Sequence, residues 1–228
     1  MYVMRPGDPA DADEITQVLD ERFVHHWKRH GHGIPELGDR LRRLLLHPGQ
    51  GGERVWVFTD DSARCRPLAG PAARYEAGTR GGAPVVGCLT LSDQLPEPQL
   101  WTAAEGRETT LSIPAFYSHP GPQLRCTGAL MHWWILDHVA RSYPQADWLR
   151  CVVPHTRLMR HLRDRYGWEY VRSAAASSGS AVHLMQRRPH AQQDLALLIT
   201  TTEPMPTPDG GGAGPAGAPS CDAVRESS

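Results

Sequence analysis

The sequence predicts an α/β fold of the α+β kind, a single domain in which helices cover both faces of a mixed central sheet of about six or seven strands. The first observation behind this prediction is the order of the elements, which is strand, two helices, three strands, helix, strand, helix and two strands. The second is the chain itself, whose 228 residues are 40% hydrophobic and 21% charged. A chain of this length and balance can bury one sizeable core.

The first sixty residues contain a strand, two helices and a second strand. Tyr2–Arg5 is a short apolar run ended by a Pro-Gly pair, which is typical of a strand. We expect Asp11 to cap the first helix, because Glu14 follows three residues later as in a capping box. The second helix is expected at 35–46 and the next strand at Glu53–Thr59. The first helix then carries apolar residues at helical spacing: Ile15, Val18, Leu19, Phe23 and Trp27.

The middle of the chain alternates between irregular and regular segments. Residues 60–83 are polar and rich in Gly and Ala, which predicts a long surface connection. A strand follows at 84–92, with Gly87 at a bulge, and 93–108 is again irregular. Residues 109–140 are expected to form a strand, a tight polar turn and a long amphipathic helix.

The C-terminal part supplies the remaining elements. Trp148–Val153 has the composition of a buried strand, and a short helix is expected from His155 to Arg165. Gly167 stands where a left-handed helix cap is favoured. Trp168–Val171 and Ala181–Gln186 are predicted to close the sheet as a pair of strands.

The predicted domain covers residues 1–187. Residues 188–202 are expected to be an extra strand, over Leu195–Thr200, or a linker. In 203–228, Pro, Gly, Ala and Ser dominate, so this segment cannot bury enough apolar surface to order itself.

Charge and cysteine content exclude several classes of function. A formal net charge of −1 gives no reason to expect a nucleic-acid or membrane-surface partner. The five cysteines show no C-x-x-C spacing, which favours a reducing compartment over a disulfide scaffold. The first residues contain no apolar signal region, and no segment approaches 18 apolar residues, so we expect a cytoplasmic protein.

The turn within 109–140 is the first functional candidate. It is rich in backbone donors, and a helix begins directly after it. The first N–H groups of a helix lack intrahelical partners and favour anionic groups, so the turn predicts phosphate binding.

The turn Gln123-Leu124-Arg125-Cys126-Thr127-Gly128 resembles the acyl-coenzyme A motif of the GNAT superfamily of N-acetyltransferases, Gln/Arg-x-x-Gly-x-Gly/Ala. Cys126 stands where the first glycine is expected. Further matches are Arg5-Pro6 at the start, the Ala-Asp-Ala-Asp-Glu-Ile helix start, and Tyr166-Gly167-Trp168. Together they span roughly residues 2–187 and lie within the family's order of elements.

The resemblance implies a splayed central sheet with acetyl-coenzyme A as co-substrate. The backbone of 124–128 would then hold the pyrophosphate, and pantetheine would pair with the strand 111–118. The backbone near Tyr117 and Ser118 would polarise the thioester carbonyl, and an amine would attack it directly. The residues implied to contact the cofactor are Phe116, Tyr117, Ser118, Gln123, Leu124, Arg125, Cys126, Thr127, Gly128 and Thr156.

The catalytic residues that the family commonly uses do not carry over. The glutamate expected about eleven residues before the motif is Ser112, and the tyrosine expected four residues before the glycine of the last helix is Arg163. By proximity, the substitutes are Tyr117, His119 and His155. For Tyr117 the alternative is a packed aromatic residue, and for His119 an exposed residue at a strand end.

Cys126 itself allows two interpretations. A thiol at a helix N-terminus has a lowered pKa and could be a nucleophile. The alternative is a tolerated small substitution, which narrows the approach of phosphate to the backbone.

The segment 25–32 is rich in histidine. His26 and His30 are four residues apart, as in zinc sites, but neither an H-E-x-x-H glutamate nor a third ligand is evident, so we predict no metal. The alternative is a polar helix end. In the family this region walls the acceptor pocket, so the resemblance implies that Trp27, His30 and His32 contact the acceptor.

These observations predict an acetyl-coenzyme A-dependent N-acetyltransferase that acts on a primary amine of a small molecule. The main alternative is a catalytically degenerate relative that only binds acyl-coenzyme A or a protein partner, which Ser112, Cys126 and Arg163 favour. A histidine-rich metal-binding module is a third alternative. A homodimer stays possible.

Overall fold

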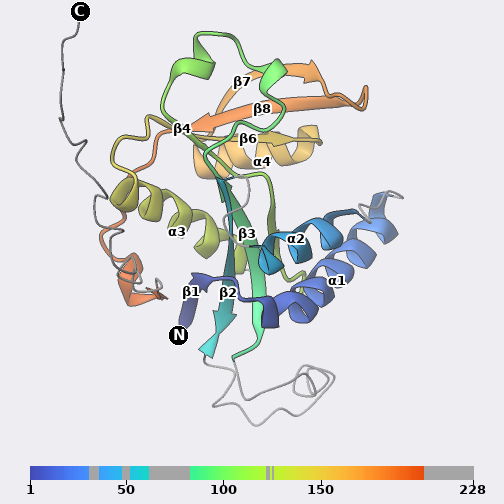
Figure 1. Cartoon of the computed structure of the whole chain (residues 1–228), viewed down its shortest axis with the longest axis vertical. Helices are drawn as coiled ribbons and strands as arrows, with labels where there is room; N and C mark the ends of the chain where they lie inside the picture. Colours follow the sequence, from blue (N-terminus) through green and yellow to red (C-terminus); the bar gives the residue numbers. More distant parts are fainter. Residues whose placement is uncertain (31–35, 48–51, 62–82, 122–123, 125, 203–228) are drawn as a thin grey trace, which may run out of the picture.

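The computed structural model describes residues 1–30, 36–47, 52–61, 83–121, 124 and 126–202, with the side chains of 23–30 and 36–37 left out (Figure 1). Most of the predicted connection 60–83 and all of the segment 203–228 therefore lie outside the described residues.

The described residues form one mixed sheet of nine strands in the order β7-β8-β6-β4-β3-β2-β1-β9, with β5 paired to β3. The β1–β9 and β4–β6 pairs are parallel and the others antiparallel, which confirms the predicted fold class. There are more strands than expected because the central strand is divided and because β9 adds to the edge. The strands are β1 (Tyr2–Pro6), β2 (Glu53–Asp60), β3 (Val85–Ser92), β4 (Thr110–Ser112), β5 (Phe116–Ser118), β6 (Trp148–Val153), β7 (Glu169–Ala175), β8 (Ala181–Arg187) and β9 (Ile199–Thr201).

Helices cover both faces of this sheet, as predicted (Figure 1). On one face, α1 and α2 pack their apolar stripes, which include Ile15 and Leu41, onto Val57 and Cys88. On the other face, α3 and α4 share a larger core with the strands. The helices are α1 (Ala12–His30), α2 (Glu36–Leu46), α3 (Thr127–Ser142) and α4 (Thr156–Tyr166).

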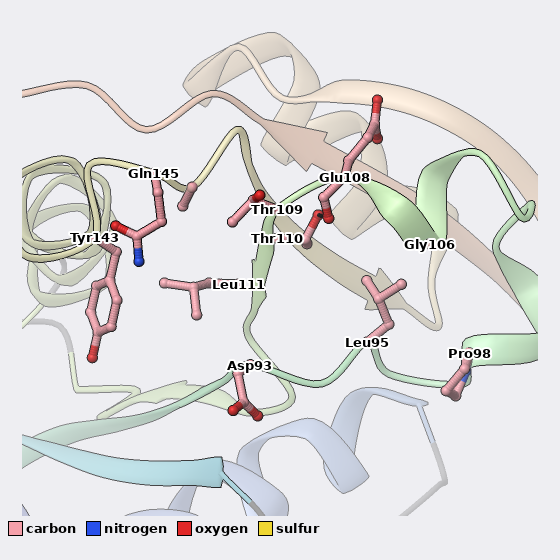
Figure 2. Close-up of a pocket in the computed structure, with 11 residues that line it drawn as sticks. Asp93, Leu95, Pro98, Gly106, Glu108, Thr109, Thr110, Leu111, Tyr143 and Gln145 are labelled. Carbon is pink, nitrogen blue, oxygen red and sulfur yellow. Dashed lines mark hydrogen bonds between the residues drawn. The ribbon is translucent and has the colours of Figure 1, made fainter.

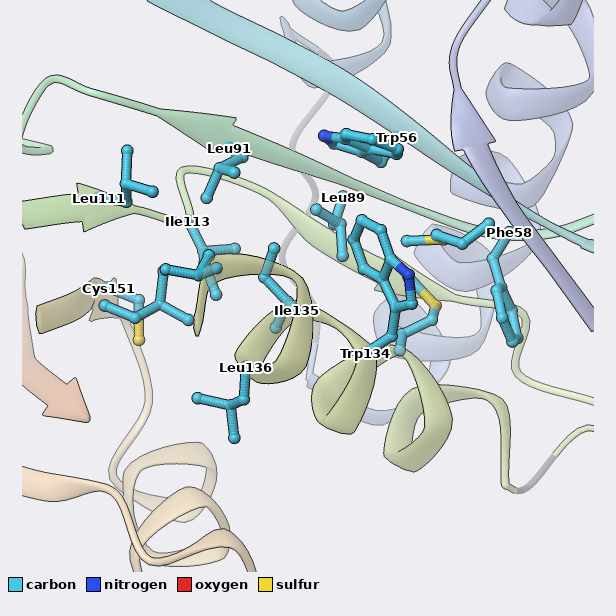
Figure 3. Close-up of a cluster of buried hydrophobic side chains, with 14 of the residues drawn as sticks. Trp56, Phe58, Leu89, Leu91, Leu111, Ile113, Trp134, Ile135, Leu136 and Cys151 are labelled. Atoms are coloured by element: carbon cyan, nitrogen blue, oxygen red, sulfur yellow. The ribbon is translucent and has the colours of Figure 1, made fainter. Parts of the chain in front are cut away.

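The core beneath α3 is the larger of the two main clusters (Figure 3). Ile135 and Leu136 are fully buried, and the indole of Trp134 lies 4.8 Å from that of Trp56 on β2. Gly87 on β3 allows α3 to lie close to the sheet, because a Cβ at this position would be 2.5 Å from the sulfur of Met131 on α3. The strand register shifts beside Gly87, as the predicted bulge requires.

The cap of the first helix differs from the prediction. Asp8, and not Asp11, is the N-cap, and a 3-10 turn at Pro9–Asp11 leads into α1. The Asp8 side chain accepts from the N–H of Ala10, and Asp11 accepts from the N–H of Asp8, which completes a capping box three residues earlier than expected. Asp11 also pairs with Arg5 through two bonds of 2.7 Å.

The predicted continuous strand at 111–118 is wrong, because Ile113–Ala115 divide it into β4 and β5. Pro114 has no N–H to give to a neighbouring strand, so a regular ladder cannot continue through it. The two halves also have different main partners. β4 runs parallel to β6, whereas β5 pairs only with β3 among the described strands.

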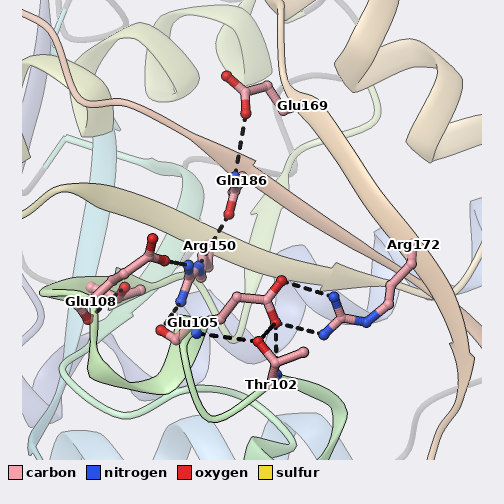
Figure 4. Close-up of polar contacts among 8 residues, drawn as sticks. Thr102, Glu105, Glu108, Arg150, Glu169, Arg172 and Gln186 are labelled. Carbon is pink, nitrogen blue, oxygen red and sulfur yellow. Dashed lines mark hydrogen bonds and ion pairs between the residues drawn. The ribbon is translucent and has the colours of Figure 1, made fainter.

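The irregular segment 93–108 folds over the face of β6 and β8 that α3 and α4 leave open (Figure 4). Trp101 packs on Leu184, and its ring stacks under the guanidinium of Arg150, 4.7 Å away. The fully buried Arg150 pairs with the carboxylate of Glu108 and donates to the carbonyl of Glu105 at 2.7 Å. This segment is therefore an anchored layer on the sheet and not a loose surface loop.

Candidate cofactor and acceptor site

The central feature of the site is an opening between β5 and β6. The last bond between the central strands runs from the N–H of Ile113 to the carbonyl of Arg150, at 2.9 Å. Beyond it, Phe116–Ser118 pair with β3 and Cys151–Val153 pair with β8, and within the described residues no pairing joins the two strands again. The sheet thus divides at Pro114.

The alternation of backbone direction identifies the groups that face this opening. His119 donates its N–H to Val86 and Ala115 accepts from Thr90, both on β3, so odd-numbered residues of β5 point to β3. The N–H and C=O of Phe116 and Ser118 consequently point into the opening. On the other side, the carbonyl of Arg150 points to β4, so the backbone of Val152 also faces the opening. Backbone groups of Phe116 and Ser118, and not those of Tyr117, therefore face the opening.

The N-terminus of α3 lies against the end of β5. A Cβ added to Gly128 would be 3.3 Å from the Oγ of Ser118, so the first helical turn contacts this strand end closely. The first N–H groups of the helix have no intrahelical partner and carry its positive dipole end. Cys126 occupies the N-cap position with an exposed side chain. Gln123 and Arg125 lie outside the described residues.

The N-terminus of α4 lies on the other side of the opening, directly after β6. His155 is the extended N-cap residue, and its side chain makes no capping bond. Thr156 begins the helix, and its Oγ1 lies 3.0 Å from Nε2 of His183. Because α3 and α4 share one core cluster, both helix starts border the opening on the same face of the sheet.

Tyr117 and His119 have structural partners in this arrangement. The ring of Tyr117 packs toward α1 and α2, and burial, together with nearby Cys88, raises its pKa to about 12. It therefore stays protonated at neutral pH. His119 Nδ1 accepts the N–H of Gly121 at 2.9 Å, so the proton of the neutral ring is on Nε2, which lies 2.6 Å from the carboxylate of Glu21. Both ring nitrogens of His119 thus fasten the turn to α1.

The two positions where the family commonly holds acid and base groups carry neither. The Oγ of the buried Ser112 donates to the carbonyl of Gln94 at 2.5 Å. Arg163 is exposed and pairs with Asp164 at 2.8 Å. Tyr166, three residues further on, packs on α3 with its ring 4.2 Å from that of His132, and burial raises its pKa.

A cavity of about 450 Å³ meets the opening on the face covered by α1 and α2. Pro114 and Val152, which border the division of the sheet, form part of its wall. Arg40 of α2 and Glu53 of β2 line another part. The segment 93–108 contributes Gln94, Leu95, Pro96 and Glu97, of which Glu97 has a left-handed backbone with φ 46°. This strained residue precedes Pro98, and its carboxylate holds Ser177 of the β7–β8 hairpin at 2.8 Å.

A second cavity, of about 610 Å³, lies at the opposite end of β4 (Figure 2). Tyr143 and Gln145 after the C-terminus of α3 line it, together with the acidic residues Asp93 and Glu108. A helix C-terminus and carboxylates repel phosphate. The second cavity is therefore unfavourable for a ligand that carries phosphate groups.

Other sequence predictions fall partly outside this description. The side chains of Trp27 and His30, and all of His32, lie outside the described residues. Among the described residues, no group of three or more potential ligands could hold a metal ion. In the same part of the chain, no helix is both long and apolar enough to span a bilayer.

The pairing of Arg40 with Glu53 in the wall of the cavity beside Pro114 was not predicted from the sequence. Arg40 reads as a residue of a solvated helix face. Glu53 begins an otherwise apolar strand, and a carboxylate at that position was the available signal.

No protein-family model matches the chain, and no curated protein matches it. Solved structures do. A GNAT-family protein from Desulfovibrio desulfuricans superposes with a TM-score of 0.55 at 14% identity, over 83% of this chain and 100% of its own. Arabidopsis thaliana NAA60 in complex with acetyl-CoA gives 0.50 at 15% identity, over 82% and 99%.

The aminoglycoside acetyltransferase AAC(6')-Ib in complex with coenzyme A gives a TM-score of 0.51 at 12% identity, over 82% of this chain and 95% of its own. Sequence identities this low establish the fold alone. These superpositions, together with the divided central strand and the helix that starts beside it, show that the chain has the fold of the GNAT superfamily of N-acetyltransferases.

Proposed function

We propose that the chain is an acetyl-CoA-dependent N-acetyltransferase that acts on a primary amine of a small molecule. The observation that carries the proposal is the opening between β5 and β6, bordered by the start of α3. Fold neighbours that hold acetyl-CoA or coenzyme A support this choice of co-substrate. The cavity of about 450 Å³ meets the same opening from the opposite face, and we call it the acceptor cavity. A cavity that meets the co-substrate site supports a transfer reaction over simple binding.

The turn and the start of α3 would hold the pyrophosphate of the co-substrate. The N–H groups of Thr127 and Gly128 belong to the first helical turn, where the dipole favours an anion. The missing side chain of Gly128 keeps this turn close to Ser118. Cys126 carries an exposed side chain at the N-cap, and direct attack by the amine needs no thiol nucleophile, so we interpret this cysteine as a tolerated substitution.

The edges of the opening would hold the pantetheine arm like an additional strand. Phe116 and Ser118 on one side, and Val152 on the other, direct backbone groups into it. The backbone N–H of Phe116, the residue of this edge nearer to Pro114, would stabilise the negative charge that develops on the thioester oxygen. Such a donor contributes without a change in geometry during the reaction.

The reaction proposed is direct attack by the amine. The nitrogen forms a bond to the acetyl carbonyl carbon, and the carbon–sulfur bond breaks. The proton that the nitrogen loses balances the one that the leaving sulfur gains. Because Ser112 is bonded to Gln94 and Arg163 is a cation, we infer that these protons pass to and from water, and that the rate depends mainly on positioning and on the oxyanion donor.

The hydrogen bond of Ser112 also favours the second candidate, a catalytically inactive acyl-CoA-binding module. The two candidates differ in thiol release. Incubated with acetyl-CoA and a panel of primary amines, the chain should release free coenzyme A at a rate that depends on the amine. Tight binding of acetyl-CoA with no release above the amine-free rate, for any amine of the panel, would favour the inactive module.

A further inference from the structure

The acceptor cavity is lined by a buried carboxylate, that of Glu53, in which only one of the two oxygens has a hydrogen-bond partner within the described residues. Glu53 is 9% exposed, and its Oε2 accepts a bond of 2.8 Å from Arg40. Its other oxygen, Oε1, is buried and has no hydrogen-bond partner within the described residues. Buried carboxylate oxygens normally have a donor, because an unsatisfied one loses its hydration without compensation.

The sheet register places Glu53 relative to the reacting centre. Glu53 lies opposite Ser92, and Ser92 lies opposite Ser112, so the three residues form one row across β2, β3 and β4. Side chains of directly opposed residues share a face of the sheet. With neighbouring strands about 4.8 Å apart, the Glu53 backbone is about 10 Å from the divided strand. The Glu53 backbone is therefore two strands away from the divided strand, and its side chain lines the cavity that Pro114 also borders.

We propose that Oε1 of Glu53 binds a second cationic group of the acceptor, while the amine that reacts lies at the opening near Pro114. The acceptor would thus be a compound with two amino groups separated by a flexible or extended spacer. This inference rests on the proposed function. An ammonium group supplies the donor that Oε1 lacks, and the bond it forms with a carboxylate is charge-assisted and strong.

A purely structural role for the Arg40–Glu53 pair makes a different prediction. In that case the pair only ties α2 to β2, and removing either partner should impair the protein in the same way. In the proposed role, Arg40 holds Oε2 and the acceptor binds Oε1, so the two cations repel each other across one carboxylate. Removal of Glu53 should then weaken binding of the acceptor, whereas removal of Arg40 should not weaken it and should strengthen it.

The test uses the full chain and two probes of equal length, 1,6-diaminohexane and n-hexylamine, in calorimetric titrations with coenzyme A present. Wild type should bind the diamine at least about 10-fold more tightly than the monoamine, as expected for one charge-assisted bond. Glu53→Gln should remove that preference, and Arg40→Gln should keep or increase it. Asp164→Asn, which removes one carboxylate of an exposed pair on α4, is the matched control and should change nothing.

Two results would overturn the inference: equal affinity of wild type for the two probes, or an equal loss in Glu53→Gln and Arg40→Gln. Melting temperatures of the three variants separate these results from unfolding. Two further outcomes distinguish failure of the inference from failure of the proposed function. If the diamine binds in a Glu53-dependent manner but no thiol is released from acetyl-CoA, the inference stands and the catalytic proposal does not. If the diamine is acetylated with the same KM in wild type and Glu53→Gln, the catalytic proposal stands and the inference does not.

Discussion

At the scale of single residues, the structure and the sequence-based prediction disagree on which side chains can act in catalysis. His119 uses Nδ1 to hold the backbone of Gly121 and Nε2 to contact Glu21. Tyr117, with a pKa of about 12 caused mainly by burial, does not ionise near neutral pH. Both residues were candidates because they are near the motif in sequence. Proximity along the chain says nothing about which partners occupy a side chain, and these partners come from distant elements.

The first prediction concerns His119 as a positioning residue. His119→Ala should lower kcat/KM, because the turn before α3 loses its attachment to α1. His119→Asn should restore a large part of the loss, since an amide can both donate to Glu21 and accept from a backbone N–H. Steady-state kinetics from pH 6 to 9 provide the measurement. A general base would show the opposite pattern, in which Asn fails to rescue and the pH dependence disappears.

The residues that line the acceptor cavity could not be predicted from the sequence. Glu53, Arg40 and Pro114 are far apart along the chain and meet only because of the strand order. Similarly, Arg150 stands in an apolar run that predicts a buried strand, and nothing local indicates that Glu108 and Trp101 would enclose its charge.

At the scale of elements, the segment 93–108 is the main addition to the predicted fold. It reads as irregular because its apolar residues have no period, yet Trp101, Glu105 and Glu108 anchor it to β6 and β7 (Figure 4). By contrast, helices with strong periodicity and the apolar strands were predicted to within a few residues. The divided central strand was missed because the apolar pattern continues through Pro114, and only the missing N–H of that residue interrupts the ladder.

The second prediction tests the attachment of this segment. Arg172 bonds the carboxylate of Glu105 at 2.6 and 2.8 Å, and this hydrogen bond is the main cause that lowers the pKa of Glu105 from 4.5 to about 2. A carboxylate with a depressed pKa stabilises the fold above its unfolded-state pKa, and this stabilisation is lost as the pH falls toward the folded-state value. Glu105→Gln should therefore cost about 1 kcal/mol at pH 7, since the pair is partly exposed.

Urea unfolding at several pH values checks this prediction. The difference in unfolding free energy between wild type and Glu105→Gln should shrink steadily from about pH 4.5 to about pH 2. A difference that stays constant over this range would contradict the account of the ion pair.

The third prediction concerns the contact of β3 with α3. A Cβ at Gly87 would lie 2.5 Å from the sulfur of Met131 and 3.0 Å from the carbonyl of Tyr117. Gly87→Ala should destabilise the fold by about 1–3 kcal/mol through overpacking. Gly38 on α2 is the matched control, because a Cβ there meets no atom within 4 Å, and Ala should stabilise the helix by about 0.5–1 kcal/mol. Equal effects of the two substitutions in thermal unfolding would argue against the close approach at Gly87.

At the scale of the whole molecule, the order of elements predicted the fold well, because local periodicity and short connections leave few ways to arrange this series of strands and helices. The count of strands and the shape of the site depend on long-range pairing. The opening between β5 and β6 arises from a division of the sheet at its centre. In the proposed function, the co-substrate would bind on one face, between α3 and α4, and the acceptor would bind in the cavity on the other face. This two-sided arrangement is the central claim about function.

The measurement that tests this claim most directly is the affinity for coenzyme A of two glycine variants, compared by calorimetry. Gly128→Leu places a side chain against Ser118 at the start of α3, whereas Gly106→Leu adds the same bulk beside the second cavity, where a Cβ meets no atom within 4 Å. Wild type and Gly106→Leu should bind coenzyme A equally, and Gly128→Leu should bind it at least about 10-fold more weakly. Unchanged affinity in Gly128→Leu, or a loss confined to Gly106→Leu, would contradict the placement of the co-substrate at the divided strand.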